Sequence, residues 1–298
     1  GDPEGAAAAL VGVQTQSLEG RLTQALAVAG TAVMGVTDPA EAVARVREIR
    51  HVAVDLGDPV AVIIASWAEA AATHARGDLP SMVQARLRET YALPELAVSV
   101  FDGQLCAVEH LLYGGLPYPE VIAFAEALRA EADRLGAARG RAFAMTFRGE
   151  AKLLSGQLDE ADADLAEGAD LHRAIRGATG EAMSLQRRAE VALYRGDRRL
   201  AHALLDEALD VARTSNVGLH LYDRIYGTRI AAAADPGSAM AALEEAEAAV
   251  SGALETCLGC RITLAVPAAI AAARFGDLER ASSYEAVVEK LTSLHMRQ

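Results

Sequence analysis

The pair Cys257 and Cys260, three positions apart, has the spacing in this sequence that most directly points to chemistry. A Cys-x-x-Cys pair can supply half of a metal site, and His220 is the nearest candidate for a further ligand. The pair can also be redox-active, because thiols at a helix N-terminus have lowered pKa values and react more readily. Alternatively, both side chains fill space where a helix begins. The third cysteine, Cys106, falls within an apolar helical pattern, so we expect it to be buried.

Motifs of nucleotide binding and hydrolysis are absent from the sequence. The only lysines are Lys152 and Lys290, and no Gly-x-x-x-x-Gly-Lys run exists, which excludes a P-loop in this chain. The His-Glu-x-x-His and Gly-x-Ser-x-Gly motifs are missing too. We therefore expect no enzyme activity, no catalytic residues, no cofactor and no metal beyond the candidates Cys257 and Cys260.

Composition restricts the partners and the compartment. The 298 residues carry 28 Lys and Arg against 41 Asp and Glu, a net charge of −13, which argues against binding nucleic acid or an anionic membrane. No signal peptide is evident and apolar stretches such as 262–273 are too short to span a bilayer, so we expect a cytoplasmic protein. The chain begins Gly1-Asp2-Pro3 without Met, which suggests a tag remnant or a piece of a longer protein.

The elements that must position these residues repeat with a period near 40. Alanine-rich amphipathic segments, which favour helices, alternate with glycine turns at separations of 38, 41, 40, 41 and 39 residues. The turn glycines are Gly77, Gly115, Gly156, Gly196, Gly237 and Gly276. Glycine provides a left-handed helix end, and the following Asp197 or Asp277 can cap the next helix.

Each period predicts one helix hairpin, and Asp38-Pro39 predicts the start of a further helix. We expect an all-α protein, one solenoid domain over residues 1–298. The expected hairpins are 5–57, 60–92, 100–136, 141–176, 181–216, 221–253 and 262–294.

The turns at Gly156, Gly196 and Gly276 share a pattern of a small residue, the glycine, and alanine five positions later. This pattern resembles the tetratricopeptide repeat. Units near 40 residues look like the divergent repeats of large MalT-like and LuxR-type ATP-binding transcription regulators of actinobacteria. The stretch from Cys257-Leu258-Gly259-Cys260 through Val266-Pro267 to Gly276-Asp277-Leu278 resembles the last repeats of such regulators. The resemblance implies a right-handed superhelix of about seven hairpins.

The same resemblance implies a concave binding groove on the first helix of each hairpin. Glu109, Glu150 and Glu190 each stand six residues before a turn glycine, so they should form an acidic column there. The residues expected in the groove are Trp67, His74, Glu109, Phe143, Glu150, Gln186, Glu190, Leu193, Tyr194 and Arg224. The alternative is that the column pairs with Arg148, Arg187 or Arg188 of adjacent hairpins.

Function follows from the resemblance as an expectation. The groove would hold a peptide, a protein segment or a small-molecule effector, and binding would act on an attached ATPase or DNA-binding module of a transcription regulator. A free-standing adaptor that bridges protein partners is the second hypothesis. The third is a redox or metal-dependent function of Cys257 and Cys260.

Overall fold

Helix is the only regular structure in the described part of the chain, as alanine-rich amphipathic segments require. The computed structural model describes residues 2–33, 35–76, 81–83, 85–86, 111–112, 116–215, 218–250 and 258–292. No strand occurs in these ranges, and the helices pack in adjacent pairs, as they do in an α-solenoid. The predicted all-α class is confirmed.

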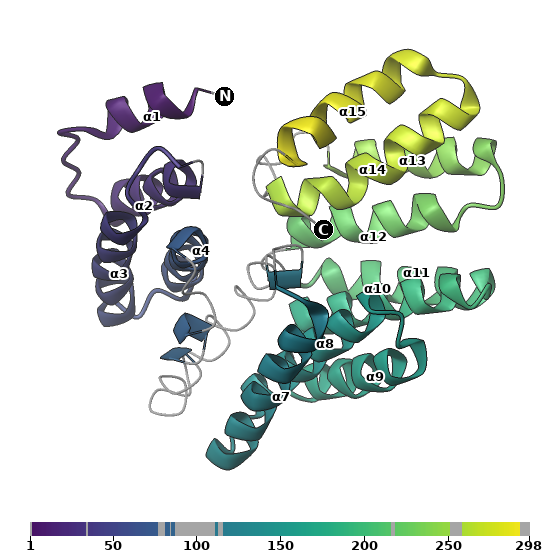
Figure 1. The fold of residues 1–298 in the computed structure, drawn as a ribbon, viewed down its shortest axis with the longest axis horizontal. Helices are drawn as coiled ribbons and strands as arrows, with labels where there is room; N and C mark the ends of the chain where they lie inside the picture. Colours follow the sequence, from purple (N-terminus) through teal and green to yellow (C-terminus); the bar gives the residue numbers. More distant parts are fainter. Residues whose placement is uncertain are drawn as a thin grey trace. The chain divides into compact units, whose positions relative to one another are not determined.

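Residues 1–110 and 130–140 form one compact unit, and residues 111–129 and 141–298 form another. The first unit contains α1 (Pro3–Leu10), α2 (Leu18–Val33), α3 (Pro39–Asp55) and α4 (Pro59–Arg76) (Figure 1). Helix α4 packs against both α3 and α2, and alanine and valine fill the core between them. The expectation of one domain over 1–298 stays a prediction.

The second unit contains the first part of α7 (Tyr118–Leu135) and most of the successive helix pairs that follow α7 in Figure 1. The first helices of these pairs are α8 (Ala138–Leu154), α10 (Ala178–Tyr194), α12 (Gly218–Ala232) and α14 (Leu258–Phe275). The second helices are α9 (Leu158–Ala174), α11 (Arg198–Ala212), α13 (Pro236–Val250) and α15 (Leu278–Thr292). Four predicted hairpins therefore match observed pairs to within a few residues.

Glycine forms the turn within three of these pairs, as predicted. Gly156, Gly196 and Gly276 have φ values of 81°, 79° and 97°, the left-handed region that glycine adopts without a steric penalty. The prediction for Gly237 was wrong, because Gly237 lies inside α13 near its start. There Asp235 accepts the amide of Ser238 and Pro236 is the first helical residue. Gly77 and Gly115 lie outside the described residues.

Aspartates begin several helices as the sequence predicted. Asp38 accepts the amides of Ala40 and Glu41 at the start of α3. Asp197 accepts the amide of Leu200 at 2.9 Å, and Asp277 that of Arg280 at 3.0 Å. These bonds satisfy amide groups that a helix N-terminus otherwise leaves without a partner.

Helices α12 and α14 approach each other closely at Gly227. A Cβ atom there would lie 2.0 Å from the carbonyl oxygen of Thr263 on α14. Pro267, inside α14, has no amide hydrogen to donate to that carbonyl four residues earlier. The α12 backbone therefore packs onto a carbonyl that has lost its helical donor. Among the described residues, no helix combines the length and hydrophobicity needed to cross a bilayer.

Candidate functional site

The first helices of successive pairs lie side by side in the second unit. Helix α12 packs against both α10 and α14. Helix α8 meets α10 through buried hydroxyls, with Thr146 Oγ1 2.9 Å from Ser184 Oγ. Residues about one period apart in sequence are thereby brought into contact, which is the condition for a column of equivalent side chains.

Two of the three column glutamates are joined by an arginine between them. Glu150 on α8 is only 1% exposed, and its carboxylate accepts a hydrogen bond from Arg187 Nε on α10 at 2.9 Å. Arg187 Nη1 donates to Glu190 at 2.9 Å. Glu109 lies outside the described residues. The acidic column therefore exists over α8 and α10, but the chain itself holds its innermost carboxylate.

Gln186 extends this arrangement to α12. Its side-chain amide, on a residue 2% exposed, donates to Glu190 at 2.7 Å and to Thr228 Oγ1 at 2.8 Å. We call Glu150, Arg187, Glu190, Gln186 and Thr228 the polar ladder. Side-chain hydrogen bonds join three first helices through the ladder, so its members fix the register of neighbouring hairpins.

Electrostatics at the ladder favour a structural role for Glu150. Burial raises the pKa of the Glu150 carboxyl, the Arg187 guanidinium opposes that rise, and the nearby Glu190 carboxylate adds to it. One guanidinium is thus shared by two carboxyl groups of unequal burial. Glu190 keeps about a quarter of its side chain exposed, at 24%, and is the ladder carboxylate that a ligand can reach.

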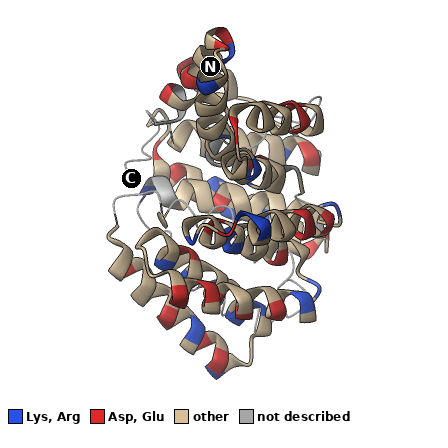
Figure 2. Ribbon diagram, turned by 90° about the vertical axis from the view of Figure 1, so that its right-hand side faces the viewer, with Lys and Arg blue, Asp and Glu red and all other residues tan. Residues whose placement is uncertain are grey.

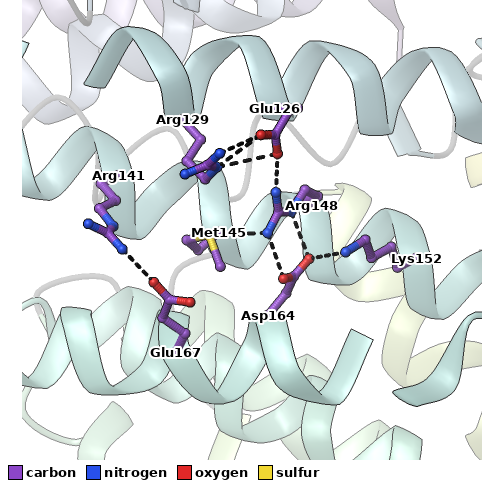
Figure 3. Close-up of polar contacts among 8 residues, drawn as sticks. All are labelled: Glu126, Arg129, Arg141, Met145, Arg148, Lys152, Asp164 and Glu167. Carbon is purple, nitrogen blue, oxygen red and sulfur yellow. Dashed lines mark hydrogen bonds and ion pairs between the residues drawn. The ribbon is translucent and has the colours of Figure 1, made fainter. Parts of the chain in front are cut away.

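The other arginines considered as partners of the column bind aspartates of α9 instead. Arg148 contacts Asp164 through two bonds of 2.7 Å, and Lys152 Nζ lies 2.7 Å from the same carboxylate (Figure 3). Arg148 also pairs with Glu126 of α7, which Arg129 contacts at 2.5 Å. Hydrogen bonds from Arg129 and Arg148 lower the pKa of Glu126 to about 2. These contacts tie α7, α8 and α9 together.

Arg188 likewise leaves the column and donates to Asp162 at 2.9 Å. Acidic and basic residues are interspersed along the helices in Figure 2, in keeping with these pairs. Of the three arginines proposed as partners of the glutamate column, Arg187 is the one that pairs with Glu150 and Glu190, the column members that the structure describes.

The remaining predicted groove residues differ in exposure. Phe143 was expected in the groove, but it is 1% exposed, and its ring stacks on that of Phe147 of the same helix with 6.3 Å between the ring centroids. Tyr194 is 72% exposed at the end of α10. Leu193 is partly buried beside it. In the first unit Trp67 is partly buried on α4, while the side chain of His74 lies outside the described part.

Arg224 belongs to a second polar cluster, between α12 and α14. Its Nη2 lies 3.7 Å from Cys260 Sγ, and His220 Nδ1 lies 3.8 Å from the same sulfur. We call His220, Arg224 and Cys260 the thiol cluster. The hydrogen bond with Cys260 raises the pKa of His220, and the carboxylate of Asp223, which pairs with Arg261 at 3.4 Å, adds to that rise.

The structure therefore brings His220 next to Cys260, as the metal interpretation required, whereas Cys257 and Cys106 lie outside the described residues. In the described part of the chain, no three His, Cys, Asp or Glu side chains are grouped so that they could hold a metal ion. A hollow of about 460 Å³ between α11, α12 and α13, lined by His202, Arg229 and Glu245 among others, contains none of the predicted groove residues.

The sequence analysis did not identify Thr228 or Asp223, and it named Arg187 only as one of three alternative partners of the glutamate column. The separations of the bonded pairs contain the signal that would have found them. Arg187 and Glu150 are 37 positions apart, Gln186 and Thr228 are 42 apart, and Asp223 and Arg261 are 38 apart. A search for complementary polar residues one period apart would have identified these contacts.

No protein-family model matches the sequence, and no curated protein matches it either.

Proposed function

We propose that the chain is the partner-binding sensor domain of a bacterial transcription regulator and has no catalytic activity of its own. The observation that carries this proposal is the polar ladder. It bonds the first helices of three successive hairpins to one another, so the residues exposed on those helices share one rigid surface. A surface ordered in advance loses little conformational entropy when a partner binds.

The exposed end of α10 offers the contact residues. Tyr194 lies one helical turn after Glu190, so the exposed ring and the ladder carboxylate share a face of the helix. Exposed tyrosines are frequent anchors of protein interfaces, and a carboxylate beside one favours a cationic neighbour. The partner that fits is a peptide or protein segment with apolar and basic side chains. Binding of this segment would change the activity of an ATP-binding or DNA-binding module attached to the domain.

Site-specific crosslinking tests this proposal. A photoreactive phenylalanine analogue replaces Tyr194 in the organism that encodes the chain, and the matched control carries it at Glu244, an exposed position on the second helix α13. We expect light-dependent crosslinks from position 194 to a nucleotide-binding or DNA-binding protein segment, identified by mass spectrometry, and none from position 244. Equal crosslinks from both positions, or none from 194, would overturn the proposal. A partner unrelated to transcription would favour the adaptor hypothesis instead.

A further inference from the structure

The thiol cluster lies where α12 packs against α14 and places a thiol beside two nitrogen groups. Cys260 Sγ lies between an imidazole nitrogen at 3.8 Å and a guanidinium nitrogen at 3.7 Å, both contributed by α12. A thiol between two such groups is stabilised as the thiolate, which is the form that reacts. Among the described residues, the charged groups at the pair include His220, Asp223 and Arg224 from α12 and Arg261 from α14.

Burial restricts what can reach the sulfur. Cys260 is 0% exposed, whereas His220 is only partly buried. Bulky electrophiles are therefore excluded from the folded protein, and a metal ion would have to displace the Arg224 guanidinium, which repels cations. A hydroperoxide as small as hydrogen peroxide is the oxidant whose size fits and which an anionic sulfur attacks.

We propose that Cys260 is a thiolate held by His220 and Arg224 and that hydrogen peroxide oxidises it to the sulfenic acid. The sulfur attacks one peroxide oxygen, the S–O bond forms and the O–O bond breaks. The leaving hydroxide takes the proton from the His220 imidazolium and departs as water. Sulfur loses two electrons, the peroxide gains them, and the ion pair between α12 and α14 is replaced by two neutral groups.

The packing around the cluster gives this oxidation a structural effect. Gly227 on α12 contacts the Thr263 carbonyl so closely that even a methyl group would not fit, and Thr263 is three residues after Cys260. An oxygen atom added to a fully buried sulfur at the same junction must displace one helix. Oxidation is therefore expected to loosen the α12–α14 pairing and lower the melting temperature of the full chain.

The test uses the full chain with Cys106→Ser and Cys257→Ser, so that Cys260 is the single thiol. The protein is exposed to hydrogen peroxide, unfolded rapidly in dimedone, and analysed by intact mass. We expect one dimedone adduct, which Cys260→Ser abolishes. His220→Asn should slow its formation about tenfold or more at pH 7, because an ordinary thiol is only about 3% thiolate there. His202→Asn, on the neighbouring α11, is the matched control and should react at the unaltered rate.

A second measurement needs no change within the cluster. Oxidation of free glutathione slows about tenfold per pH unit below neutrality, because its thiolate fraction falls in that proportion. Oxidation of the Cys260-only chain should slow far less between pH 8 and pH 6.5. The proposal is overturned if the folded chain stays unmodified while the unfolded chain reacts, or if the pH dependence equals that of glutathione. Equal rates for the His220 and His202 variants would overturn it as well.

Discussion

Arg187 on α10 donates from Nε to the carboxylate of Glu150 on α8 across 37 positions of sequence, and both side chains are almost completely buried. A buried ion pair contributes little net stability, but the loss of one partner leaves the other charge without compensation. The cost of breaking this pair must therefore depend on which partner is removed.

Arg187→Met is predicted to lower the free energy of unfolding by about 3–5 kcal/mol, because it strands the Glu150 carboxylate in the core. Glu150→Gln keeps an acceptor for Arg187 and removes the charge whose burial raises the pKa, so its effect should stay within about 1 kcal/mol. Urea denaturation of both variants measures the difference. Equal losses would contradict this interpretation.

Arg195→Met is the matched control for that pair. Arg195 also contacts two carboxylates, those of Asp159 and Asp162, but on the surface with 35% of its side chain exposed. Water stabilises the carboxylates that remain, so this variant should lose far less stability than Arg187→Met.

Glu126 predicts an acid-sensitive contact between α7 and α8. Its pKa is lowered to about 2 by hydrogen bonds from Arg129 and Arg148. A group whose pKa is lower in the folded than in the unfolded state stabilises the fold above its unfolded pKa. That stabilisation is lost as the pH falls from about 4 towards 2. Glu126→Gln should therefore lower the melting temperature at pH 6 and lose this effect progressively below pH 4, in thermal unfolding followed by circular dichroism.

Gly227 predicts a large effect for a small substitution. Gly227→Ala places a methyl group against the Thr263 carbonyl and should destabilise by about 1–3 kcal/mol, because backbone cannot yield as a side chain can. A Cβ atom at Gly30, on the exposed face of α2, would meet no atom within 4 Å, so Gly30→Ala should stabilise by about 0.5–1 kcal/mol. Chemical denaturation should therefore give opposite signs for the two variants.

Arg176 is a residue with a strained backbone at the turn between α9 and α10. Its φ is 57°, in the region that Gly57 and Gly136 occupy in the turns before α4 and α8. Arg176→Gly should raise the free energy of unfolding by up to about 1 kcal/mol, because glycine carries no penalty there. Arg213→Gly, at a helix end with φ of −60°, should instead reduce it. A stabilising Arg213→Gly would contradict the backbone explanation.

Much of the fold was predictable because its signals are local. The glycines at 156, 196 and 276 and the cap at Asp38 act within a few residues, and each lies where the sequence placed it. The prediction of a turn at Gly237 was wrong although the glycine fits the repeat period, because Asp235 caps the helix that begins just before Gly237. The position of a turn depends on local hydrogen bonds, and a regular spacing alone does not distinguish between neighbouring candidates.

The candidate site was less predictable, because burial depends on how closely helices approach. The repeat predicted that Glu150 and Glu190 share one column, but it did not distinguish Arg187 from Arg148 and Arg188 as the arginine that lies between them. Phe143 has the spacing expected of a groove residue and is nevertheless buried. Periodicity determines which side chains are neighbours, whereas the size of every surrounding residue determines which of them reach solvent.

The period-spaced contacts of the polar ladder have a consequence for the evolution of the chain. Identical hairpins could be duplicated, deleted or exchanged freely, since every junction would be the same. Here each junction between hairpins has its own pair of complementary side chains. If the hairpin α10–α11 were deleted, Glu150 would face α12 without Arg187, its hydrogen-bond donor. The buried side chains of each hairpin therefore fit only its own neighbours, which fixes the order of the hairpins. Recombination within the array is restricted to exchanges that move both sides of a junction together.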